Sequence, residues 1–424
     1  MKTSSISLGM LSASLLLTTA IVPAKAATIS TSGTCSLAQA IDAANTNAAV
    51  GGCAAGAVGR DRIIVTSDVV LTAANNGLNG LPVILEDLII TATGPTRSIQ
   101  RSTAIATPNF RFLEIGSATV APAVTVSNII MWNGHVNGPV NLFGLGGVGG
   151  GCILLNNGAL KITDSSLTEC VAEGDDNLIG NGGNAFGGAI YAAAGSLEIK
   201  NSSLVFNEAR GGDATAAGNL PGSATGGAID AVGLTSLTIE DSVIDSNFAT
   251  GGAGVSSGAN ATGGGVAFSG SNGIGTGSFT GTTFSANAVI NGVGSSGTSG
   301  IGMGGALAAT TVALTMSDVD FVNNVANGAD NPAGQGGYAF GGAIYAHGGT
   351  LDLDSCDIAQ NRATAGTGSV PPSDGTGGGG GMFLIDANAT LERVTVESNT
   401  LSGNDPIGGG IAVSNGNTTD ETLL

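Results

Sequence analysis

Acidic side chains are the groups of this sequence that could do chemistry, because carboxylates bind calcium and act as general acids and bases. The chain has 31 Asp and Glu residues against 12 Lys and Arg residues. On a repeating scaffold, catalytic carboxylates and a basic partner should recur one repeat apart, and Asp230 is the clearest candidate. The equivalent positions of other repeats hold no acid: Tyr191, Ala267, Ala308 and Tyr345. We find no carboxylate column and assign no catalytic residues.

The other charged residues near the turns of the repeat have ordinary explanations. Asp241, Asp318 and Asp354 lie near one turn, where a solvated corner accounts for an acid. Arg210 and Arg362 closely follow the third strand of their repeats, with Ala and Asn around them. None of these residues has a neighbour in the sequence that would make it reactive.

Metal and cofactor ligands are also sparse. His135 and His347, the only histidines, have no acidic neighbours in the sequence, which favours structural or surface roles. The segment GDDNLIGNGG, residues 174–183, is similar to the glycine- and aspartate-rich calcium nonapeptide, but it occurs once and out of register. No cysteine spacing suggests zinc, and the phosphate-loop, nucleophile-elbow and H-E-x-x-H motifs are absent. We expect no metal or cofactor site, with calcium at residues 174–183 as the open alternative.

A repeat with steps of 29 to 41 residues must position these side chains. In each unit a triplet GGC, GGA or GGG precedes an apolar marker residue. The markers are Ile153, Ile190, Ile229, Val266, Leu307, Ile344, Met382 and Ile411. An asparagine follows 17 to 21 residues later, and Cys170 takes its place in the first unit. The asparagines are Asn207, Asn247, Asn287, Asn324, Asn361 and Asn399.

Alternating apolar residues between marker and asparagine, such as Leu197 and Ile199, have the period of two that is typical of a β-strand. Each unit therefore holds three short strands, too few to bury a face alone, and stacked units would bury all of them. We predict an all-β fold, a right-handed parallel β-helix with one coil per unit. The glycines allow tight corners, and the asparagines tolerate a left-handed turn and can stack as a hydrogen-bonded ladder.

The rest of each repeat is rich in Gly, Ala and Ser, as in residues 211–225 and 366–376. These insertions fall at the same phase of every coil, so we expect them along one edge of the solenoid. Such an edge is often the binding surface of a repeat protein. Flexible, solvated filler is the alternative interpretation.

Residues 1–26 predict a secretory signal peptide, because Lys2 precedes an apolar run that ends in an A-x-A sequence. Its removal leaves ten Lys and Arg residues (12 − 2) against 31 acids, a formal charge of −21. Such a charge repels phosphate backbones, so no nucleic-acid partner is expected. No later segment reaches about 18 consecutive apolar residues, so no transmembrane segment is expected in the mature chain.

The mature chain divides into a predicted N-terminal capping segment, residues 27–60, and a β-helix, residues 61–424. The β-helix comprises first coils in residues 61–149 and glycine-rich repeats in residues 150–424, the last of them incomplete. Ser36 and Gln39 match a capping box, which predicts a short helix that covers the open end of the core. Its apolar face would hold Leu37, Ala40, Ile41 and Ala44.

Five cysteines follow the signal peptide of a chain that we expect to be secreted. Cys35 and Cys53 flank the predicted helix and could form a disulfide. Cys152 and Cys170 occupy equivalent ends of one coil and could form another. Cys356 is left over, and we expect it to be buried.

The repeat also resembles a known one. The combination of GGA and Ile or Leu with an apolar-x-x-Asn sequence, over residues 150–424, resembles the repeat of bacterial polymorphic outer membrane proteins, which form β-helical surface and autotransporter passenger domains. CSLAQAIDAANTN, residues 35–47, is similar to the opening of secreted bacterial β-helix proteins named for a Cys-Ser-Leu-Arg-Glu-Ala motif, with Ala38 and Gln39 in place of Arg and Glu. Residues 96–116 resemble the first coils of the same group. The resemblance implies a secreted, extracellular protein, with association with a bacterial outer membrane as a further implication.

Two classes of function follow. The favoured class is a secreted or cell-surface β-helical repeat protein with a structural or adhesive, non-enzymatic role, whose partner would be an extracellular glycan or a surface protein. The alternative is a pectate lyase-like polysaccharide lyase or glycoside hydrolase that acts on acidic or plant-type polysaccharide. An enzyme needs a groove with clustered acidic and basic groups, whereas an adhesin needs only a repeated outward surface, so the surface should separate the two.

Overall fold

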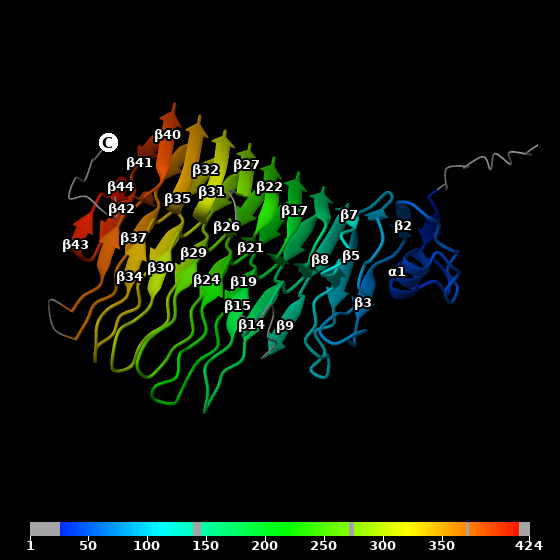
Figure 1. Cartoon of the computed structure of the whole chain (residues 1–424), viewed down its shortest axis with the longest axis horizontal. Helices are drawn as coiled ribbons and strands as arrows, with labels where there is room; N and C mark the ends of the chain where they lie inside the picture. The colour runs from blue at the N-terminus through cyan, green and yellow to red at the C-terminus, as the bar shows by residue number, and fades with distance from the viewer. Residues whose placement is uncertain (1–25, 139–145, 271–274, 370–372, 415–424) are drawn as a thin grey trace, which may run out of the picture.

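The chain folds into an all-β, parallel β-solenoid of about 10 turns, with the helix α1 (Leu37–Thr46) at its N-terminal end (Figure 1). This computed structural model describes residues 26–138, 146–270, 275–369 and 373–414. The predicted signal peptide lies outside the described residues, apart from Ala26. The predicted parallel β-helix with a short N-terminal helix is confirmed.

The described strands form four parallel sheets, which we call sheets I to IV. Sheet I is built from β1 (Thr28–Ser30), β2 (Asp61–Val65), β4 (Leu88–Ala92), β6 (Leu113–Ile115), β7 (Ala123–Ser127), β11 (Ile153–Leu155), β12 (Ala159–Thr163), β16 (Ile190–Ala192), β17 (Gly195–Lys200), β21 (Ile229–Val232), β22 (Leu234–Glu240), β26 (Val266–Ser269), β27 (Gly275–Thr280), β31 (Leu307–Ser317), β35 (Ile344–Asp354), β39 (Met382–Ile385), β40 (Asn388–Glu392) and β44 (Ile411–Ser414). Sheet II is built from β3 (Val69–Leu71), β5 (Arg97–Arg101), β8 (Ile129–Trp132), β13 (Ser166–Thr168), β18 (Ser203–Val205), β23 (Val243–Asp245), β28 (Thr283–Ser285), β32 (Asp320–Val322), β36 (Asp357–Ala359) and β41 (Thr395–Glu397).

Sheets III and IV extend each coil beyond the predicted asparagine. Sheet III is built from β9 (His135–Gly138), β14 (Val171–Gly174), β19 (Glu208–Arg210), β24 (Phe248–Thr250), β29 (Ala288–Ile290), β33 (Val325–Asn327), β37 (Arg362–Thr364) and β42 (Thr400–Ser402). Sheet IV is built from β10 (Gly147–Gly149), β15 (Asn184–Phe186), β20 (Ala224–Thr225), β25 (Ala261–Thr262), β30 (Ile301–Met303), β34 (Tyr338–Phe340), β38 (Thr376–Gly378) and β43 (Asn404–Ile407). The repeat pattern predicts only the three strands of sheets I and II, because these two extra strands are short and rich in Ala and Gly.

Apolar side chains of equivalent positions stack from coil to coil in the main core. Leu197 pairs in register with Leu237, and Ile199 with Ile239, between β17 and β22. Leu204 of β18 pairs with Ile244 of β23 in sheet II. These side chains are at most 1 % exposed and belong to one continuous core. Every coil therefore buries the apolar face of its neighbour, as the period-two pattern predicts.

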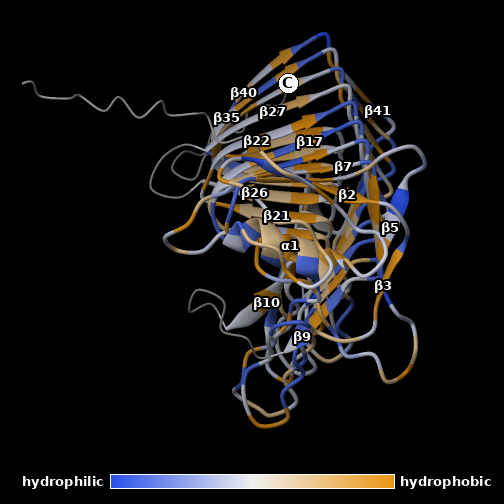
Figure 2. Cartoon of the chain, turned by 90° about the vertical axis from the view of Figure 1, so that its right-hand side faces the viewer, coloured by the Kyte–Doolittle hydropathy of each residue, from blue (hydrophilic) through white to orange (hydrophobic). Residues whose placement is uncertain are grey.

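A second core, between sheets III and IV, is narrow because its side chains are small. Its buried members are Val136, Val148, Ala172, Ala185, Ala209, Ala224, Ala249, Ala261, Val289, Ala326, Ala339 and Ala363. Figure 2 looks along the stack of coils, with α1 in front, and shows the narrow part carrying β9 and β10 below the wide part. From β9 onward, the Gly- and Ala-rich stretches thus form an extension of the coils.

The corners of the coils are turned by residues in left-handed conformation. One such corner, between sheets I and II, is occupied by Asn128, Asp164, Asn201, Asp241, Asp318, Ser355 and Arg393, with φ between 45° and 56°. At the next corner the left-handed residue is the one before each ladder asparagine, such as Phe206 (φ 58°) before Asn207. The prediction that the asparagine itself takes the left-handed turn is therefore wrong. At the glycine-led corner, Gly226 has φ 66°, and a Cβ there would lie 2.1 Å from the carbonyl oxygen of Ile229.

Helix α1 covers the N-terminal end of the core. Ser36 Oγ accepts a hydrogen bond from Gln39 N at 3.2 Å, and Ser36 N donates to Gln39 Oε1 at 3.0 Å, which completes the predicted capping box. The helix buries Leu37, Ala40, Ile41, Ala43 and Ala44 against the main core. The helix therefore shields apolar side chains that the first coil would otherwise expose.

Candidate functional site

Four of the five cysteines form two disulfide bonds, one beside helix α1 and one in the first glycine-rich repeat. Cys35 is joined to Cys53 with a Cα–Cα distance of 4.6 Å, and Cys152 is joined to Cys170 with a Cα–Cα distance of 5.5 Å. Cys356 is a buried free thiol, and burial raises its pKa. A buried thiol with a raised pKa is a poor nucleophile, so Cys356 is not a candidate for chemistry.

The six asparagines form a ladder along the corner between sheets II and III. The side-chain amide of each donates to the amide oxygen of the next, from Asn207 through Asn247, Asn287, Asn324 and Asn361 to Asn399, at 2.9 to 3.0 Å. Each Nδ2 also donates to a backbone carbonyl of the preceding coil, as Asn207 does to Leu167 O at 3.1 Å. Disulfide-bonded Cys170 stands at the head of the ladder and donates its backbone N–H to Asn207 Oδ1. From Asn207 to Asn361 each ladder amide is hydrogen-bonded through both its oxygen and its nitrogen, so these side chains are structural.

Asp230 is buried rather than placed in a groove. Its side chain is 2 % exposed, and burial raises its pKa well above the ordinary value. Its register partners are Tyr191 and Ala267, and no side-chain hydrogen bond or ion pair to it is found among the described residues. A buried acid whose register partners hold no second carboxylate cannot act as half of an acid–base pair.

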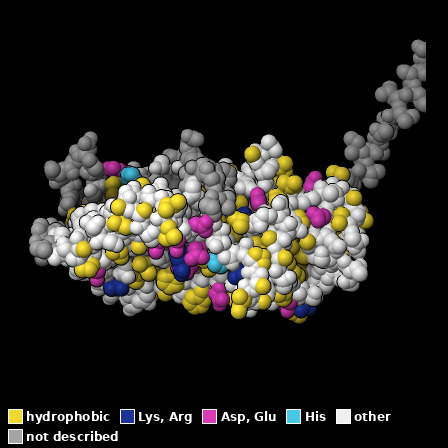
Figure 3. Space-filling model, turned by 90° about the horizontal axis from the view of Figure 1, so that it is seen from below, with side chains coloured by type: hydrophobic (Ala, Val, Ile, Leu, Met, Phe, Trp, Pro, Cys, Tyr) yellow, Lys and Arg dark blue, Asp and Glu magenta, His cyan; other side chains and the backbone are white. Residues whose placement is uncertain are grey.

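The outer face of sheet III carries an ionic cluster that the sequence order conceals. His135 Nε2 lies 3.1 Å from Glu173 Oε2, so His135 has an acidic neighbour in space although it has none in the sequence. Arg210 lies within β19, the strand that follows the third strand of its repeat, and its Nη2 donates to Glu208 Oε1 at 2.9 Å. Arg210 Nη1 also lies 3.6 Å from Glu173 Oε1. Figure 3 shows acidic, basic and histidine side chains gathered on the face that contains the loops.

The electrostatics of this cluster favour pairing over proton transfer. The hydrogen bond with His135, together with the charges of His135 and Arg210, lowers the pKa of Glu173 although burial opposes this. The hydrogen bond with Glu208 raises the pKa of Arg210. A carboxylate held ionised in this way is unsuited to the general-acid role that glycoside hydrolysis needs. Glu173 and Arg210 pair in register on neighbouring coils, so their separation of one 37-residue repeat is the signal that could have revealed them.

Most other predicted polar residues lie apart from this cluster. Asp241 and Asp318 hold left-handed corner positions, while Asp354 ends β35 and pairs with Arg393. Arg362 begins β37 on sheet III, and no ion pair to it is found in the described part of the chain. His347 is exposed on β35 in sheet I.

The glycine-rich loops that join sheets III and IV stack in register. Parallel bridges link Asn177 to Ala214, Ala214 to Gly254 and Gly254 to Gly294. The necks of successive loops are joined by backbone hydrogen bonds, including Gly212 N to Gly183 O at 2.8 Å and Gly252 N to Gly222 O at 2.9 Å. A Cβ at Gly222 would lie 1.7 Å from Gly183 O, so this close approach requires glycine. Four successive loops, those that contain Asn177, Ala214, Gly254 and Gly294, therefore stack in register along one edge of the solenoid (Figure 1).

The segment GDDNLIGNGG, residues 174–183, forms the first of these loops in the described residues. Asn177 Oδ1 accepts hydrogen bonds from Ile179 N and Gly180 N, and Asp176 Oδ1 accepts one from Asp213 N. Burial and the charges of Asp176 and Glu173 raise the pKa of Asp175. Across the described residues, no group of three His, Cys, Asp or Glu side chains is arranged to hold a metal ion.

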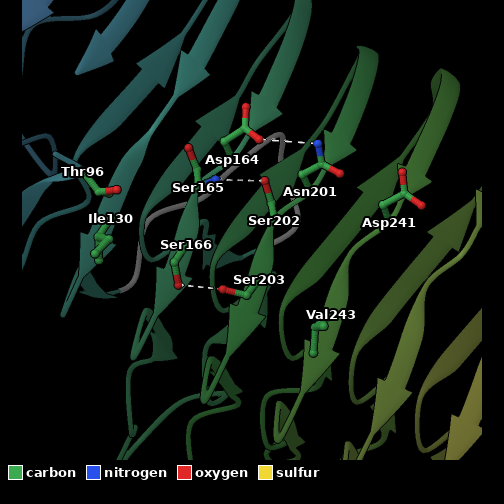
Figure 4. A pocket seen from close by; sticks show the side chains of 10 residues that line it. All are labelled: Thr96, Ile130, Asp164, Ser165, Ser166, Asn201, Ser202, Ser203, Asp241 and Val243. Atoms are coloured by element: carbon green, nitrogen blue, oxygen red, sulfur yellow. Dashed lines mark hydrogen bonds between the residues drawn. The ribbon is translucent and has the colours of Figure 1, made fainter. Parts of the chain in front are cut away.

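A shallow hollow of about 620 Å³ lies at the corner between sheets I and II (Figure 4). Asp164, Asn201 and Asp241 form a row of successive corner residues along it. Ser203 Oγ donates to Ser166 Oγ at 2.9 Å on the strands beside this row. Hydroxyl, amide and carboxylate groups thus recur here at the spacing of the coils.

Arg111 is a buried residue that the sequence reading missed. Its guanidinium is 3 % exposed and donates to Gly149 O, Gly150 O and Asn79 Oδ1 at 3.0 to 3.2 Å. Burial lowers its pKa to about 10, which the charge of Glu114 partly opposes. These contacts join the first coils to the glycine-rich repeats, so Arg111 is structural.

Comparison with protein-family models, with curated proteins and with solved structures finds no match to this chain. None of the helices in the described residues is long and apolar enough to cross a membrane. The role of the chain therefore has to be argued from its own surface.

Proposed function

We propose that this chain is a secreted or cell-surface β-helical repeat protein with a structural and adhesive role and without enzymatic activity. The observation that carries the proposal is the edge of stacked loops, whose backbones are paired in register and hydrogen-bonded from coil to coil. Ordered loops on a rigid solenoid are the usual place for binding in repeat proteins, since little conformational entropy is lost on binding. The two disulfides and the resemblance to bacterial surface and secreted β-helices support an extracellular location, with outer-membrane association as part of the proposal.

The polar hollow at the corner between sheets I and II is the surface that we assign to an extracellular glycan. Its repeated hydroxyl, amide and carboxylate groups offer donors and acceptors at the spacing between strands, which suits an extended polymer of sugars. Two of the basic residues that a polyuronate would need are engaged by acids, in the pairs Lys161–Glu198 and Lys200–Glu240. A neutral glycan is therefore expected here in preference to an acidic one.

The experiment compares binding with turnover on the same purified chain, residues 27–424. Binding is measured on an array of neutral and acidic glycans, and turnover is measured on polygalacturonate, with and without calcium, as unsaturated products and new reducing ends. We expect binding without turnover, and weaker glycan binding by Asn201→Ala than by the control Asp352→Asn on the outer face of sheet I. Turnover that Glu173→Gln abolishes would overturn the proposal in favour of the pectate lyase-like alternative.

A further inference from the structure

The tips of the first two stacked loops expose large aliphatic side chains. Leu178, Ile179 and Leu220 are 74 %, 90 % and 60 % exposed. The two loops touch, because Leu220 N donates to Asn181 Oδ1 at 2.9 Å and Thr215 Oγ1 lies 3.5 Å from Leu178 O. Exposed aliphatic groups gathered at one place on a folded surface commonly mark an interaction site.

A hollow of about 700 Å³ lies beside these tips. Its lining combines apolar and acidic groups: Leu220 and Pro221 on one loop, and Asp175, Asp176 and Asn177 on the other. A partner that fills it would therefore meet aliphatic carbon and carboxylate oxygen at the same time.

The charge around the hollow is only partly balanced within the described part of the chain. Arg210 interacts electrostatically with Asp176, but its ion pairs are made with Glu208 and Glu173. The raised pKa of Asp175 has the charges of Asp176 and Glu173 among its causes, as expected for acids that repel one another. A cationic partner would relieve this repulsion, whereas an anionic lipid surface or a second copy of this acidic chain would add to it.

Backbone hydrogen bonds fix the conformation of the two loops. Asn177 N donates to Asp213 O at 2.8 Å, and Gly183 N donates to Asp175 O at 2.9 Å within the first loop. Ala214 N donates to Ala253 O of the next loop at 2.9 Å. A preformed surface of this kind binds without a large ordering cost.

We propose that residues 175–183 and 213–221 form a docking surface for a partner protein segment that carries both basic and aliphatic side chains. The aliphatic side chains of the segment pack against Leu178, Ile179 and Leu220, and its basic groups pair with Asp175 and Asp176. This inference rests on the proposed binding role and names the class of protein partner that the loop edge takes.

The test uses the purified chain, residues 27–424, and synthetic peptides as probes. The first peptide alternates Lys and Leu, the second replaces Lys with Glu, and the third replaces Leu with Ser. We expect saturable binding of the first peptide by isothermal titration calorimetry, and neither of the others should bind comparably. Binding should weaken as salt is added, because exposed charges are screened.

Paired variants locate the site. Leu178→Ser with Ile179→Ser, and separately Asp175→Asn with Asp176→Asn, should each weaken binding of the Lys–Leu peptide about tenfold or more, as truncation of an interface anchor does. The matched controls are Ile105→Ser, at a fully exposed isoleucine elsewhere, and Asp352→Asn, and both should bind normally. All four changes are at exposed or partly exposed side chains, so circular dichroism should show unchanged folding.

Several results would overturn the inference. Binding that survives both loop variants, equal binding of the Glu–Leu peptide, or binding to anionic phosphatidylserine vesicles in preference to the peptide would each contradict it. If the chain binds glycans on the array but not the Lys–Leu peptide, the inference fails while the proposed function stands. If it binds neither and degrades polygalacturonate, the proposed function itself fails.

Discussion

Removing one amide from the middle of the asparagine ladder should destabilise the solenoid strongly, although the change is neutral and small. In Asn287→Ala, four hydrogen bonds are lost. Asn287 Oδ1 accepts from Asn247 N at 3.1 Å and from Asn247 Nδ2 at 2.9 Å. Asn287 Nδ2 donates to Ile244 O at 2.7 Å and to Asn324 Oδ1 at 3.0 Å.

The cost follows from the burial of the groups left behind. Asn287 is 0 % exposed, so water does not replace the lost bonds without entering the core. At about 1 to 1.5 kcal/mol for each bond, the free energy of unfolding should fall by roughly 4–6 kcal/mol. Asn399→Ala should cost less, because Asn399 is half-buried and ends the described ladder with three bonds: from Asn361 N and Nδ2, and to Ile358 O.

The assay is urea unfolding of the purified chain, followed by far-ultraviolet circular dichroism and by the fluorescence of Trp132, the only tryptophan. Using both signals shows whether coils unfold together or in sequence, which a stacked repeat allows. Asn327→Ala on the same coil as Asn324 is the control, because Asn327 is half-buried at the end of β33 and no side-chain hydrogen bond to it is found among the described residues. It should change stability by no more than about 0.5 kcal/mol. Equal midpoints for Asn287→Ala and Asn327→Ala would refute the reasoning.

Three further predictions test other parts of the structure. Asp230→Asn should raise the urea midpoint at pH 7 but not near pH 3. Because burial raises the pKa of Asp230, the folded protein loses stability as the pH rises above the ordinary pKa of 3.8. A constant difference in midpoint across this pH range would contradict the prediction. Arg111→Met should lower the free energy of unfolding by roughly 3–5 kcal/mol, measured in the same way, because it leaves buried acceptors unpaired. The double change Cys35→Ser and Cys53→Ser should cost about 3 kcal/mol and speed amide exchange in α1 first, whereas uniform exchange would argue against a local staple.

Much of the fold could be predicted because large apolar residues occupy alternate positions of the strands and recur at the same positions of each repeat. The alternation of Leu197 and Ile199 with polar residues predicts a strand. The same alternation at Leu237 and Ile239 predicts the equivalent strand of the next coil. The strands of sheets III and IV could not be predicted in this way. Most of their inward residues are Ala, as at Ala209 in β19, and Ala does not distinguish these strands from the Gly- and Ala-rich loops that follow.

The candidate site was harder to predict, because its members are neighbours only across coils. His135 and Glu173 are 38 residues apart, and the sequence around His135 contains no acid. Their contact depends on the register of β9 against β14, in which Val171 stands opposite His135. A difference of one residue in that register would turn the glutamate to the other face of the sheet.

The sequence by itself determined the repeat, the parallel β-helix, the capping helix at Ser36, the plausible cysteine pairs and the row of asparagines, because each depends on residue type at a regular spacing. Only the tertiary structure decided which polar groups meet. It buried Asp230, paired Glu173 with His135 and Arg210, and brought Leu220 beside the acidic loop that contains Asp175. The physical reason is that coil length varies from repeat to repeat, and loop contacts depend on how each coil closes onto the next.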